Sequence, residues 1–317
     1  MGAGVSGLTT AICLQQAGYK VEIVTREAPP FTTSDKAAAV WLPYAAGPVE
    51  KVRQWSGETY LECKNLSKDP ESGIYFVELL LLAKDVNELE PDWSRSLPSG
   101  SWRVADAAEL PPGYDTAFAL EVPMIETPIY LPYLLSRFQA GGGAIHMRAA
   151  TSLEELLEPD RLVVNCTGLG AKTLTGDTEL YPIKGNIIVG RIDGNEPWLR
   201  CLVDNVAQNN LAYILPRKRT GDIMLGGTAI EHDDTPEFAP AEVTGVNERC
   251  LNLIPELKDL QVIRMDAGLR PGRKNIRLGW DAELSGLIHN YGHGGSGFTV
   301  AWGCGRAVAR LAEKAKS

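Results

Sequence analysis

The first seven residues carry the pattern G-x-G-x-x-G, whose fixed positions are Gly2, Gly4 and Gly7. Small and apolar residues follow at helical spacing until Gly18, and residues 21–24 then have the composition of a strand. In this setting the first glycine makes a tight turn, the second lets the backbone approach a pyrophosphate, and the third lets helix and strand pack closely. The pattern predicts a dinucleotide-binding loop, the alternative being a structural glycine-rich turn; the loop residues are Gly2, Ala3, Gly4, Val5, Ser6 and Gly7.

A second glycine-rich run, at residues 292–297, lies near the opposite end of the chain and leads into a helix predicted from Phe298 to Lys314. Both runs can point a helix N-terminus at a cofactor. FAD fits this arrangement better than a nicotinamide dinucleotide, because FAD is held along its whole length by segments far apart in sequence. His289 and His293 lie four residues apart, but the surrounding glycines argue against a helix, so we expect no metal site.

The residues after the first predicted strand offer further cofactor contacts. Arg26 and Glu27 follow it, and an acidic side chain there can hold a ribose hydroxyl or can be a solvated charge. The hydroxyl groups of residues 32–34 can bind phosphate oxygens, and the alanines at 37–39 would let a flat ring approach the backbone. The alternative for this stretch is a capped turn that leads into a small-residue helix.

Helices and strands must hold these segments in place. Apolar spacing and breaker residues predict helices at 49–63, 128–139, 240–254 and 298–314. Strands are predicted at 73–82, 116–122, 162–165 and 182–189, with an antiparallel hairpin at 211–227 and an extended turn at 268–273. This order predicts an α/β fold in which a Rossmann-like FAD-binding domain carries an inserted antiparallel-sheet substrate domain. A strand should precede the first glycine pattern and only Met1 does, so we expect further residues upstream.

Composition excludes several classes of protein. The chain has 317 residues, 44% hydrophobic and 22% charged, which is ordinary for a soluble globular enzyme. A formal net charge of −9 argues against nucleic-acid binding, which requires a basic surface. No apolar run is long enough to cross a bilayer and no leader is visible, so we expect a cytoplasmic protein without a membrane partner. The six cysteines form no C-x-x-C pair, and we expect reduced, buried thiols.

Six blocks of sequence, spread over nearly the whole chain, resemble the D-amino-acid oxidase family. They are GAGVSGL, TTSDKAAAVWLPY, NCTG, AYILP, GLRPGR and HNYGHGGSGFTVAWGC, in the family's order. The last block is the most specific, whereas the glycine pattern alone would match many flavoproteins. We assign an FAD-binding domain to residues 1–45, 135–181 and 268–317, and a substrate-binding domain to residues 46–134 and 182–267.

The resemblance implies an FAD-dependent oxidase that deaminates D-amino acids, here expected to carry neutral or apolar side chains. The family moves the Cα hydrogen as hydride to flavin N5, and the imino acid hydrolyses to a 2-oxo acid and ammonia. Oxygen takes the two electrons and becomes hydrogen peroxide. Because hydride transfer depends on orientation, it requires a clamp on the substrate carboxylate, and an arginine fork is suited to that task. Relatives are often dimers, so a homodimer is an expected assembly.

Three residues match the family's substrate contacts. Arg270 matches the carboxylate-binding arginine, and Tyr213 matches a tyrosine whose hydroxyl also meets the carboxylate. Gly295 matches the glycine whose carbonyl accepts a hydrogen bond from the substrate amine. The alternatives are a surface ion pair for Arg270, a core aromatic for Tyr213 and a turn glycine at 295. Arg270 and Gly295 also match flavin contacts, as do Thr32, Thr33, Ser34, Ala38, Ala39, Val40, Ala150, Thr167, Gly294, Ser296, Gly297, Phe298 and Thr299.

The chain departs from the family pattern around the substrate pocket. Asn209 stands where animal members carry a second tyrosine on a lid, so the lid and the substrate preference cannot be carried over. Leu42 replaces a common glutamine and makes the pocket more apolar, and Ser296 stands where an aromatic residue is often found. The chain ends in Ala-Lys-Ser rather than in the peroxisomal Ser-Lys-Leu.

Three other functions fit part of the pattern. A D-aspartate oxidase would need extra positive charge in the pocket, for which Arg200, Arg217 and Lys218 are the candidates. A glycine or sarcosine oxidase would share the fold and the flavin, but the GLRP and HNYGHGG blocks favour the D-amino-acid branch. The third is a nucleotide-binding module without turnover. If a substrate bleached the flavin absorbance band, this function would be excluded.

Overall fold

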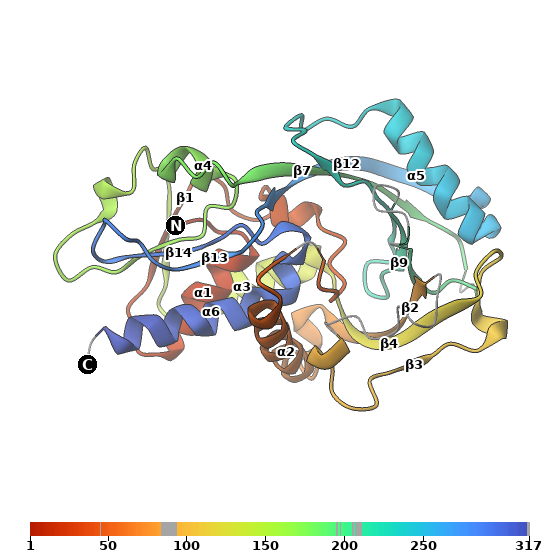
Figure 1. Ribbon diagram of the computed structural model, residues 1–317, viewed down its shortest axis with the longest axis horizontal. Helices are drawn as coiled ribbons and strands as arrows, with labels where there is room; N and C mark the ends of the chain where they lie inside the picture. The colour runs from red at the N-terminus through yellow and green to blue at the C-terminus, as the bar shows by residue number, and fades with distance from the viewer. Residues whose placement is uncertain are drawn as a thin grey trace.

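The computed structural model of the chain describes residues 1–44, 46–83, 94–194, 196, 198–204, 206 and 211–315. Helices α1, α3 and α6 and two small sheets form one end of an elongated molecule (Figure 1). A large sheet with α5 on its outside forms the other end, and α2 lies near the middle. This mixed arrangement confirms the predicted α/β fold class.

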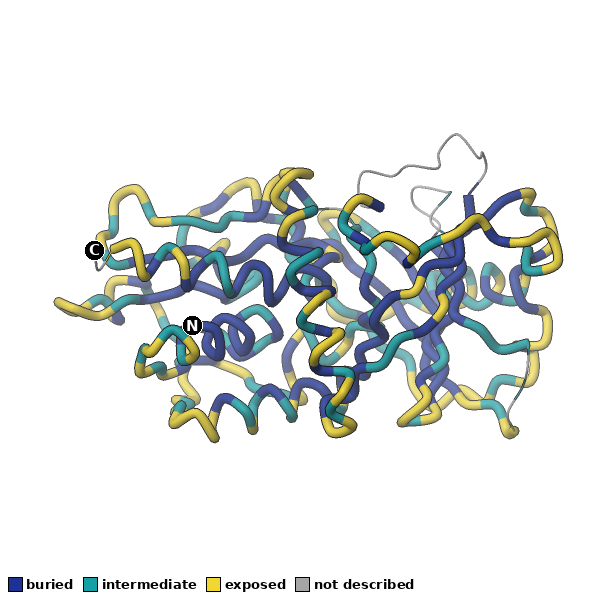
Figure 2. The backbone as a smooth tube through the Cα atoms, turned by 90° about the horizontal axis from the view of Figure 1, so that it is seen from below, coloured by how far each residue is buried: buried dark blue, intermediate teal, exposed yellow. Residues whose placement is uncertain are grey.

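The large sheet is antiparallel except where β2 and β8 pair. Among the described residues its order is β11-β7-β10-β9-β8-β2-β4-β3, and β12 also pairs with β7. Most residues of β2, β4 and β7 are buried, because apolar clusters cover both faces of the sheet. Figure 2 shows buried stretches running through the interior of the molecule. The strands are β2 (Ile74–Ala83), β3 (Trp102–Val104), β4 (Thr116–Ile125), β7 (Tyr181–Arg191), β8 (Cys201–Asp204), β9 (Ala212–Pro216), β10 (Ile223–Gly226), β11 (Ile230–Glu231) and β12 (Gln261–Gly272).

The predicted hairpin is confirmed, since β9 and β10 pair antiparallel with Tyr213 opposite Gly226. The extended turn predicted at 268–273 is wrong. Residues 268–272 form the end of β12 and pair with β7, so that Arg270 lies opposite Ile183. The partner strand is distant in sequence, and local turn signals could not reveal this pairing.

Both faces of the large sheet carry apolar clusters. Helix α5 (Pro240–Leu253) covers one face, where Val246 and Cys250 are buried against side chains such as Ile214. On the other face a second cluster contains Trp41 and Tyr60, the latter on α2 (Val49–Leu66). The segment around residue 41 is therefore part of the sheet's core, and this anchors residues that the sequence placed near a cofactor.

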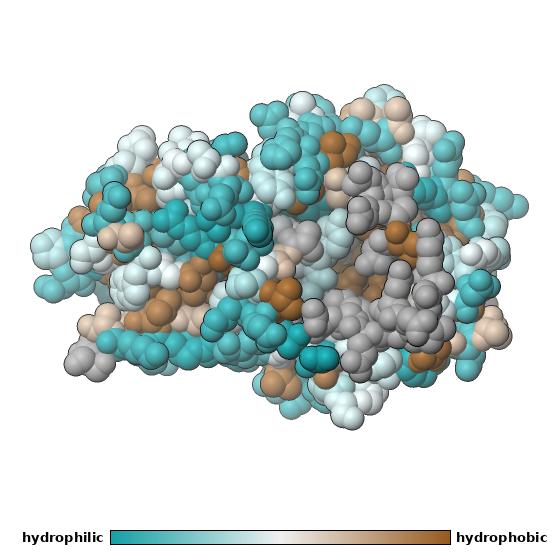
Figure 3. All heavy atoms as spheres, viewed as in Figure 1, coloured by the Kyte–Doolittle hydropathy of each residue, from teal (hydrophilic) through white to brown (hydrophobic). Residues whose placement is uncertain are grey.

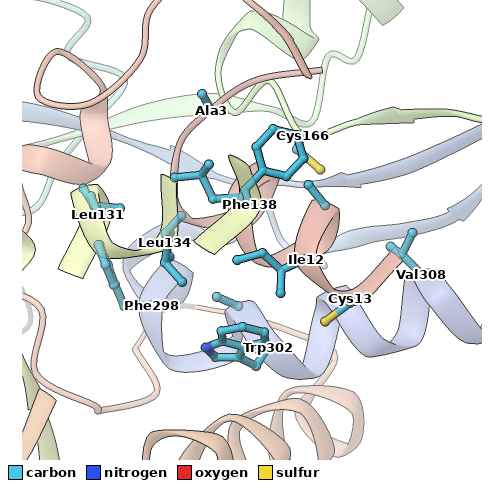
Figure 4. Close-up of a cluster of buried hydrophobic side chains, with 14 of the residues drawn as sticks. Ala3, Ile12, Cys13, Leu131, Leu134, Phe138, Cys166, Phe298, Trp302 and Val308 are labelled. Carbon is cyan, nitrogen blue, oxygen red and sulfur yellow. The ribbon is translucent and has the colours of Figure 1, made fainter. Parts of the chain in front are cut away.

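Three helices share the core of the other end. Figure 4 shows Ile12, Leu134 and Trp302 converging from α1, α3 and α6. Helix α6 approaches its neighbours closely at two glycines: a Cβ on Gly303 would lie 2.3 Å from Trp55 Cα, and a Cβ on Gly305 would lie 3.2 Å from Thr10 Cα. The helices are α1 (Val5–Gln16), α3 (Thr127–Ala140) and α6 (Gly297–Lys314), with the short α4 (Gly170–Thr175) nearby.

Met1 and Gly2 lie between the two small sheets. The Met1 amino group donates to the Val164 carbonyl at 2.7 Å, and Cys166 N–H donates to the Met1 carbonyl at 3.0 Å. On the other side Gly2 N–H donates to the Val24 carbonyl at 2.9 Å. These bonds place the glycine-rich turn at the ends of both sheets, one formed by β1 (Glu22–Thr25) and β5 (Ala144–Met147), the other by β6 (Val163–Asn165), β14 (Leu287–Tyr291) and β13 (Arg277–Trp280).

The surface drawn in Figure 3 is largely hydrophilic, with apolar residues in scattered patches. None of the helices in the described part of the chain combines the length and the apolar character needed to cross a membrane. All six cysteines are buried and unpaired, as expected.

Candidate active site

The first glycine-rich turn leaves no room for side chains on its protein side. Gly2 has a φ of +88°, and a Cβ on Gly7 would lie 1.9 Å from the Gly2 carbonyl oxygen. Ser34 packs against the same turn, because its Oγ accepts a hydrogen bond from Val5 N–H at 3.0 Å and lies 3.0 Å from where a Cβ on Gly4 would be. The turn thus needs glycine for steric reasons, and a residue from the predicted hydroxyl-rich stretch caps its helix.

Two hydroxyl groups at the start of α6 hold an extended segment from the other end of the chain. Ser296 Oγ accepts from Tyr44 N–H at 2.6 Å and donates to the Tyr44 carbonyl at 2.7 Å. Thr299 Oγ1 makes the same pair of bonds with Leu42, at 3.2 and 3.0 Å. The Ser296 hydroxyl, expected to line the substrate pocket, is engaged with this backbone, and it fixes Tyr44 above the second glycine-rich turn.

His293 connects the two glycine-rich turns. Its Nε2 lies 2.9 Å from Asn290 Oδ1, an acceptor, so Nε2 carries the proton and Nδ1 faces the Ser6 hydroxyl at 3.4 Å. Burial lowers the pKa of His293 to about 4, which keeps the ring neutral. His289 instead pairs with Asp281 at 2.8 Å. The two histidines therefore have separate structural partners.

Arg270 and Tyr213 lie together on the large sheet. The Arg270 guanidinium lies over Gly185, where a Cβ would be 2.3 Å from Nη2, and its Nη1 donates to the Thr228 carbonyl at 2.8 Å. The Tyr213 ring lies over Gly226, where a Cβ would be 2.0 Å from the ring. Burial raises the pKa of Tyr213, and the positive charge of Arg270 opposes this shift. The sheet thus presents a guanidinium and a protonated phenol side by side.

Tyr44 joins this group, although sequence reasoning did not single it out. A Cβ on Gly295 would lie 2.6 Å from Tyr44 Cδ1, so the ring covers that glycine. Burial raises the pKa of Tyr44, and Arg270 is again the charge that opposes it. The signal was present, since Tyr44 ends the block AAAVWLPY whose alanines were assigned to the cofactor.

Comparisons with known proteins identify the family. The family model described as "FAD dependent oxidoreductase" matches residues 1–311. A "D-amino-acid oxidase" of Rubrobacter xylanophilus is 42% identical over 100% of this chain and 96% of its own length.

The chain belongs to the FAD-dependent oxidoreductase family.

Other relatives of this oxidoreductase differ in the substrates that they are named for. A "D-aspartate oxidase" of Homo sapiens is 32% identical over 98% of this chain and 93% of its own length. The solved glycine oxidase of Bacillus cereus superposes with a TM-score of 0.81 at 20% identity, covering 99% of this chain and 96% of that one, and so shares the fold.

FAD is the cofactor of this family, and the residues present fit it. Predicted contact segments that lie far apart in sequence meet: Ser34 touches the first glycine turn, Ser6 faces His293, and the Gly2 backbone packs on Cys166 and Thr167. Most of the predicted contacts thus surround the N-termini of α1 and α6. Their assignment to individual FAD atoms stays a prediction.

Several predicted cofactor residues already have protein partners. Asn165 Oδ1 accepts from both Thr167 N–H and its hydroxyl, at 3.2 and 2.7 Å. Ala39 has a φ of +59°, and its carbonyl accepts from Ile125 N–H at 2.9 Å, which fixes the segment containing Ala38 and Val40 on β4. Ala150, like Met1 and Val24, packs against the apolar cluster of Leu153, Leu156, Val163 and Leu287.

One predicted pair of cofactor residues is not brought into this arrangement. Arg26 and Glu27 form an ion pair at 3.3 Å on the surface, with 75% and 47% of their side chains exposed. Such a pair contributes little to stability. Asn209, expected at the position of a lid residue, lies outside the described residues.

Proposed function

We propose that this oxidoreductase deaminates D-amino acids with neutral or apolar side chains, giving 2-oxo acids, ammonia and hydrogen peroxide. The observation that carries the proposal is the Arg270 guanidinium beside the partly buried Tyr213 side chain, next to Tyr44 and Gly295. The names of the relatives support the same substrate class.

Each residue has a role that its chemistry allows. Arg270 would bind the substrate carboxylate through two charge-assisted hydrogen bonds. Tyr213 keeps its proton near neutral pH, because burial raises its pKa, and would donate a further bond to the carboxylate. The carbonyl of Gly295 would accept from the substrate amine. FAD, when bound, supplies the acceptor for the hydride and passes electrons to oxygen. The chain's own residues would orient the Cα–H bond, and such orientation is a large part of the rate.

A neutral side chain fits better than a carboxylate at the far end of the substrate. Arg217, a candidate for binding D-aspartate, is only 3% exposed and donates through Nη2 to the carbonyls of Ala37 and Ala38 at 3.1 and 3.3 Å. Lys218 lies over the Tyr75 ring at 5.5 Å. Among the named candidates this leaves Arg200, which lies near Glu109: the hydrogen bond from Arg103 lowers the pKa of that carboxyl, and the charge of Arg200 adds a smaller effect.

We propose a division into two domains, which the large sheet supports because β2–β4, β8–β11 and all but the first residue of β7 come from residues 46–134 and 182–267. The end of β12, residues 268–272, extends the sheet past the predicted boundary at residue 268. α2 packs against α6, so we propose that it lies with the FAD-binding part. The cytoplasmic location and the homodimer stay predictions.

Anaerobic mixing of the holoprotein with single D- and L-amino acids, followed at the flavin band, tests the function. We expect bleaching by neutral D-amino acids, and a fall in kcat/KM of at least about 100-fold in Arg270→Ala. Arg310→Ala is the control, because Arg310 pairs with Glu58 on an exposed surface. Bleaching by D-aspartate alone would move the assignment to a D-aspartate oxidase, and no bleaching in an FAD-loaded protein would refute an amino-acid oxidase.

A further inference from the structure

We propose that Lys184, Asn186 and Thr228 form a positioning network that fixes the Arg270 guanidinium for carboxylate binding. The inference rests on the proposed function, since it concerns the group assigned to the substrate carboxylate. None of the three residues matched a substrate contact in the sequence.

The network begins at the backbone of Thr228. Its carbonyl accepts from Arg270 Nη1 at 2.8 Å, while Gly185 lies against the face of the guanidinium. An arginine that is anchored through one nitrogen keeps its planar fork in one orientation, and its remaining N–H groups stay available for a carboxylate. The position of the Thr228 carbonyl therefore decides where the fork points.

Hydrogen bonds from β7 hold Thr228 in place. Its Oγ1 accepts from Asn186 N–H at 2.9 Å and from Asn186 Nδ2 at 3.0 Å. The same hydroxyl lies 3.4 Å from the Lys184 carbonyl, to which it donates. Thr228 and Asn186 are both buried, so these bonds are shielded from water. Thr228 is thereby tied to the strand that also supplies Gly185.

A buried lysine attaches the same strand to α5. Lys184 Nζ lies 3.1 Å from Glu242 and 3.3 Å from Asp233, and the lysine side chain is 3% exposed. Glu242 also accepts from Asn186 Nδ2 at 2.7 Å. Asn186 therefore contacts both Glu242 and Thr228. Through these two residues, helix α5 is linked to the Arg270 guanidinium.

Lysine and asparagine at alternate positions of an otherwise apolar strand need an explanation of this kind. The sequence around them is Pro-Ile-Lys-Gly-Asn-Ile-Ile-Val, and a buried strand ordinarily excludes both residue types. Paired carboxylates compensate the buried charge of Lys184. Gly185, between the lysine and the asparagine, leaves space for the Arg270 guanidinium. The Lys-Gly-Asn sequence thus combines support for Arg270 with room for it.

Binding of propanoate, which is alanine without its amino group, tests the network independently of turnover. The dissociation constant is measured from the change in the flavin band of the holoprotein. Thr228→Val removes the hydroxyl with little change of shape, and we expect propanoate to bind about 10-fold more weakly. The KM for D-alanine should rise by a similar factor. Thr228→Ser restores the hydroxyl and should bind within about twofold of the wild type. The matched control is Thr244→Val on α5, whose hydroxyl donates to the Pro240 carbonyl within the same helix at 3.0 Å.

Equal propanoate affinity in Thr228→Val and the wild type would overturn the network, as would equal losses in Thr228→Val and Thr228→Ser. If Thr228→Val does not fold, Asn186→Ala takes its place, and unchanged affinity there has the same meaning. If the protein binds propanoate but oxidises no D-amino acid, the proposed function is refuted. The propanoate dissociation constants of the variants would still test the network. A wild type that does not bind propanoate would refute both Arg270 as a carboxylate clamp and the network.

Discussion

Gly185→Ala is expected to disable the substrate clamp while leaving the fold intact. The added methyl group would lie 2.3 Å from Arg270 Nη2 and 2.4 Å from Cζ and Nη1. Ordinary van der Waals contact begins near 3.4 Å, so the guanidinium must move by about 1 Å (3.4 − 2.4). The atoms in the way belong to the end of a flexible side chain, and the backbone of β7 can stay where it is.

A displacement of about 1 Å costs on the order of 100-fold in rate when the displaced group orients the substrate. This corresponds to about 2.7 kcal/mol of transition-state stabilisation. The movement also lengthens the bond from Arg270 to the Thr228 carbonyl, so both the position and the direction of the fork change. Stability should change by less than about 1 kcal/mol, since Gly185 is not among the glycines with positive φ.

The assay compares flavin reduction by D-alanine under anaerobic conditions in the wild type and in Gly185→Ala, with thermal unfolding of both holoproteins. Gly279→Ala on β13 is the matched control, because a Cβ there meets nothing within 4 Å. A kcat/KM in Gly185→Ala equal to that of the control would refute the reasoning. A large loss of thermal stability would show that the strand, rather than the guanidinium, had moved.

Three further outcomes are expected. Gly7→Ala should lose FAD binding, because its Cβ would lie 1.9 Å from the Gly2 carbonyl oxygen. The control Gly18→Ala has a φ of +83° and open space around the Cβ, so it should still bind FAD and lose only about 1 kcal/mol of stability. Fluorescence titration with FAD distinguishes the two variants. Burial lowers the pKa of His293 to about 4 in the folded protein. Between pH 6.5 and 4 the unfolded chain therefore binds a proton at His293 that the folded chain does not. The free energy of unfolding should fall as the pH falls, by roughly 3 kcal/mol from this group. Unfolding measured at several pH values should show less of this fall in His293→Gln; an identical pH dependence would contradict a neutral, buried ring. The six buried cysteines should resist a thiol reagent at pH 8 until the protein unfolds, as burial raises their pKa; fast labelling of the folded protein would contradict this.

Local patterns were sufficient for the first glycine turn and for most elements. Gly2 and Gly7 pack against each other within a few residues, so their spacing alone predicts the turn and the helix that follows. The hairpin of β9 and β10 was predictable for the same reason, since its strands are neighbours in sequence. Family resemblance added the identity of Arg270 and Tyr213 as candidates, and their roles stay predictions.

Local patterns failed where a residue's partner is distant. The segment around Arg270 has the composition of a turn, yet it is strand because β7 pairs with it. Arg217 was a candidate for binding substrate, and only the structure shows its guanidinium directed at the carbonyls of Ala37 and Ala38. The sequence shows that a side chain is charged, but only the packing of the folded chain determines where the charged group points.

The sequence by itself determined the glycine-rich turns, the fold class and the apolar strands, because each depends on the types and spacing of nearby residues. Only the tertiary structure decided that Ser296 and Thr299 hold the backbone of residues 42–44. The same is true of the contacts that link Lys184 and Thr228 to the support of Arg270. These contacts join segments that are far apart in the chain. Their energies depend on distances of a few ångströms and on burial, and both exist only after β7, β12 and α6 have packed.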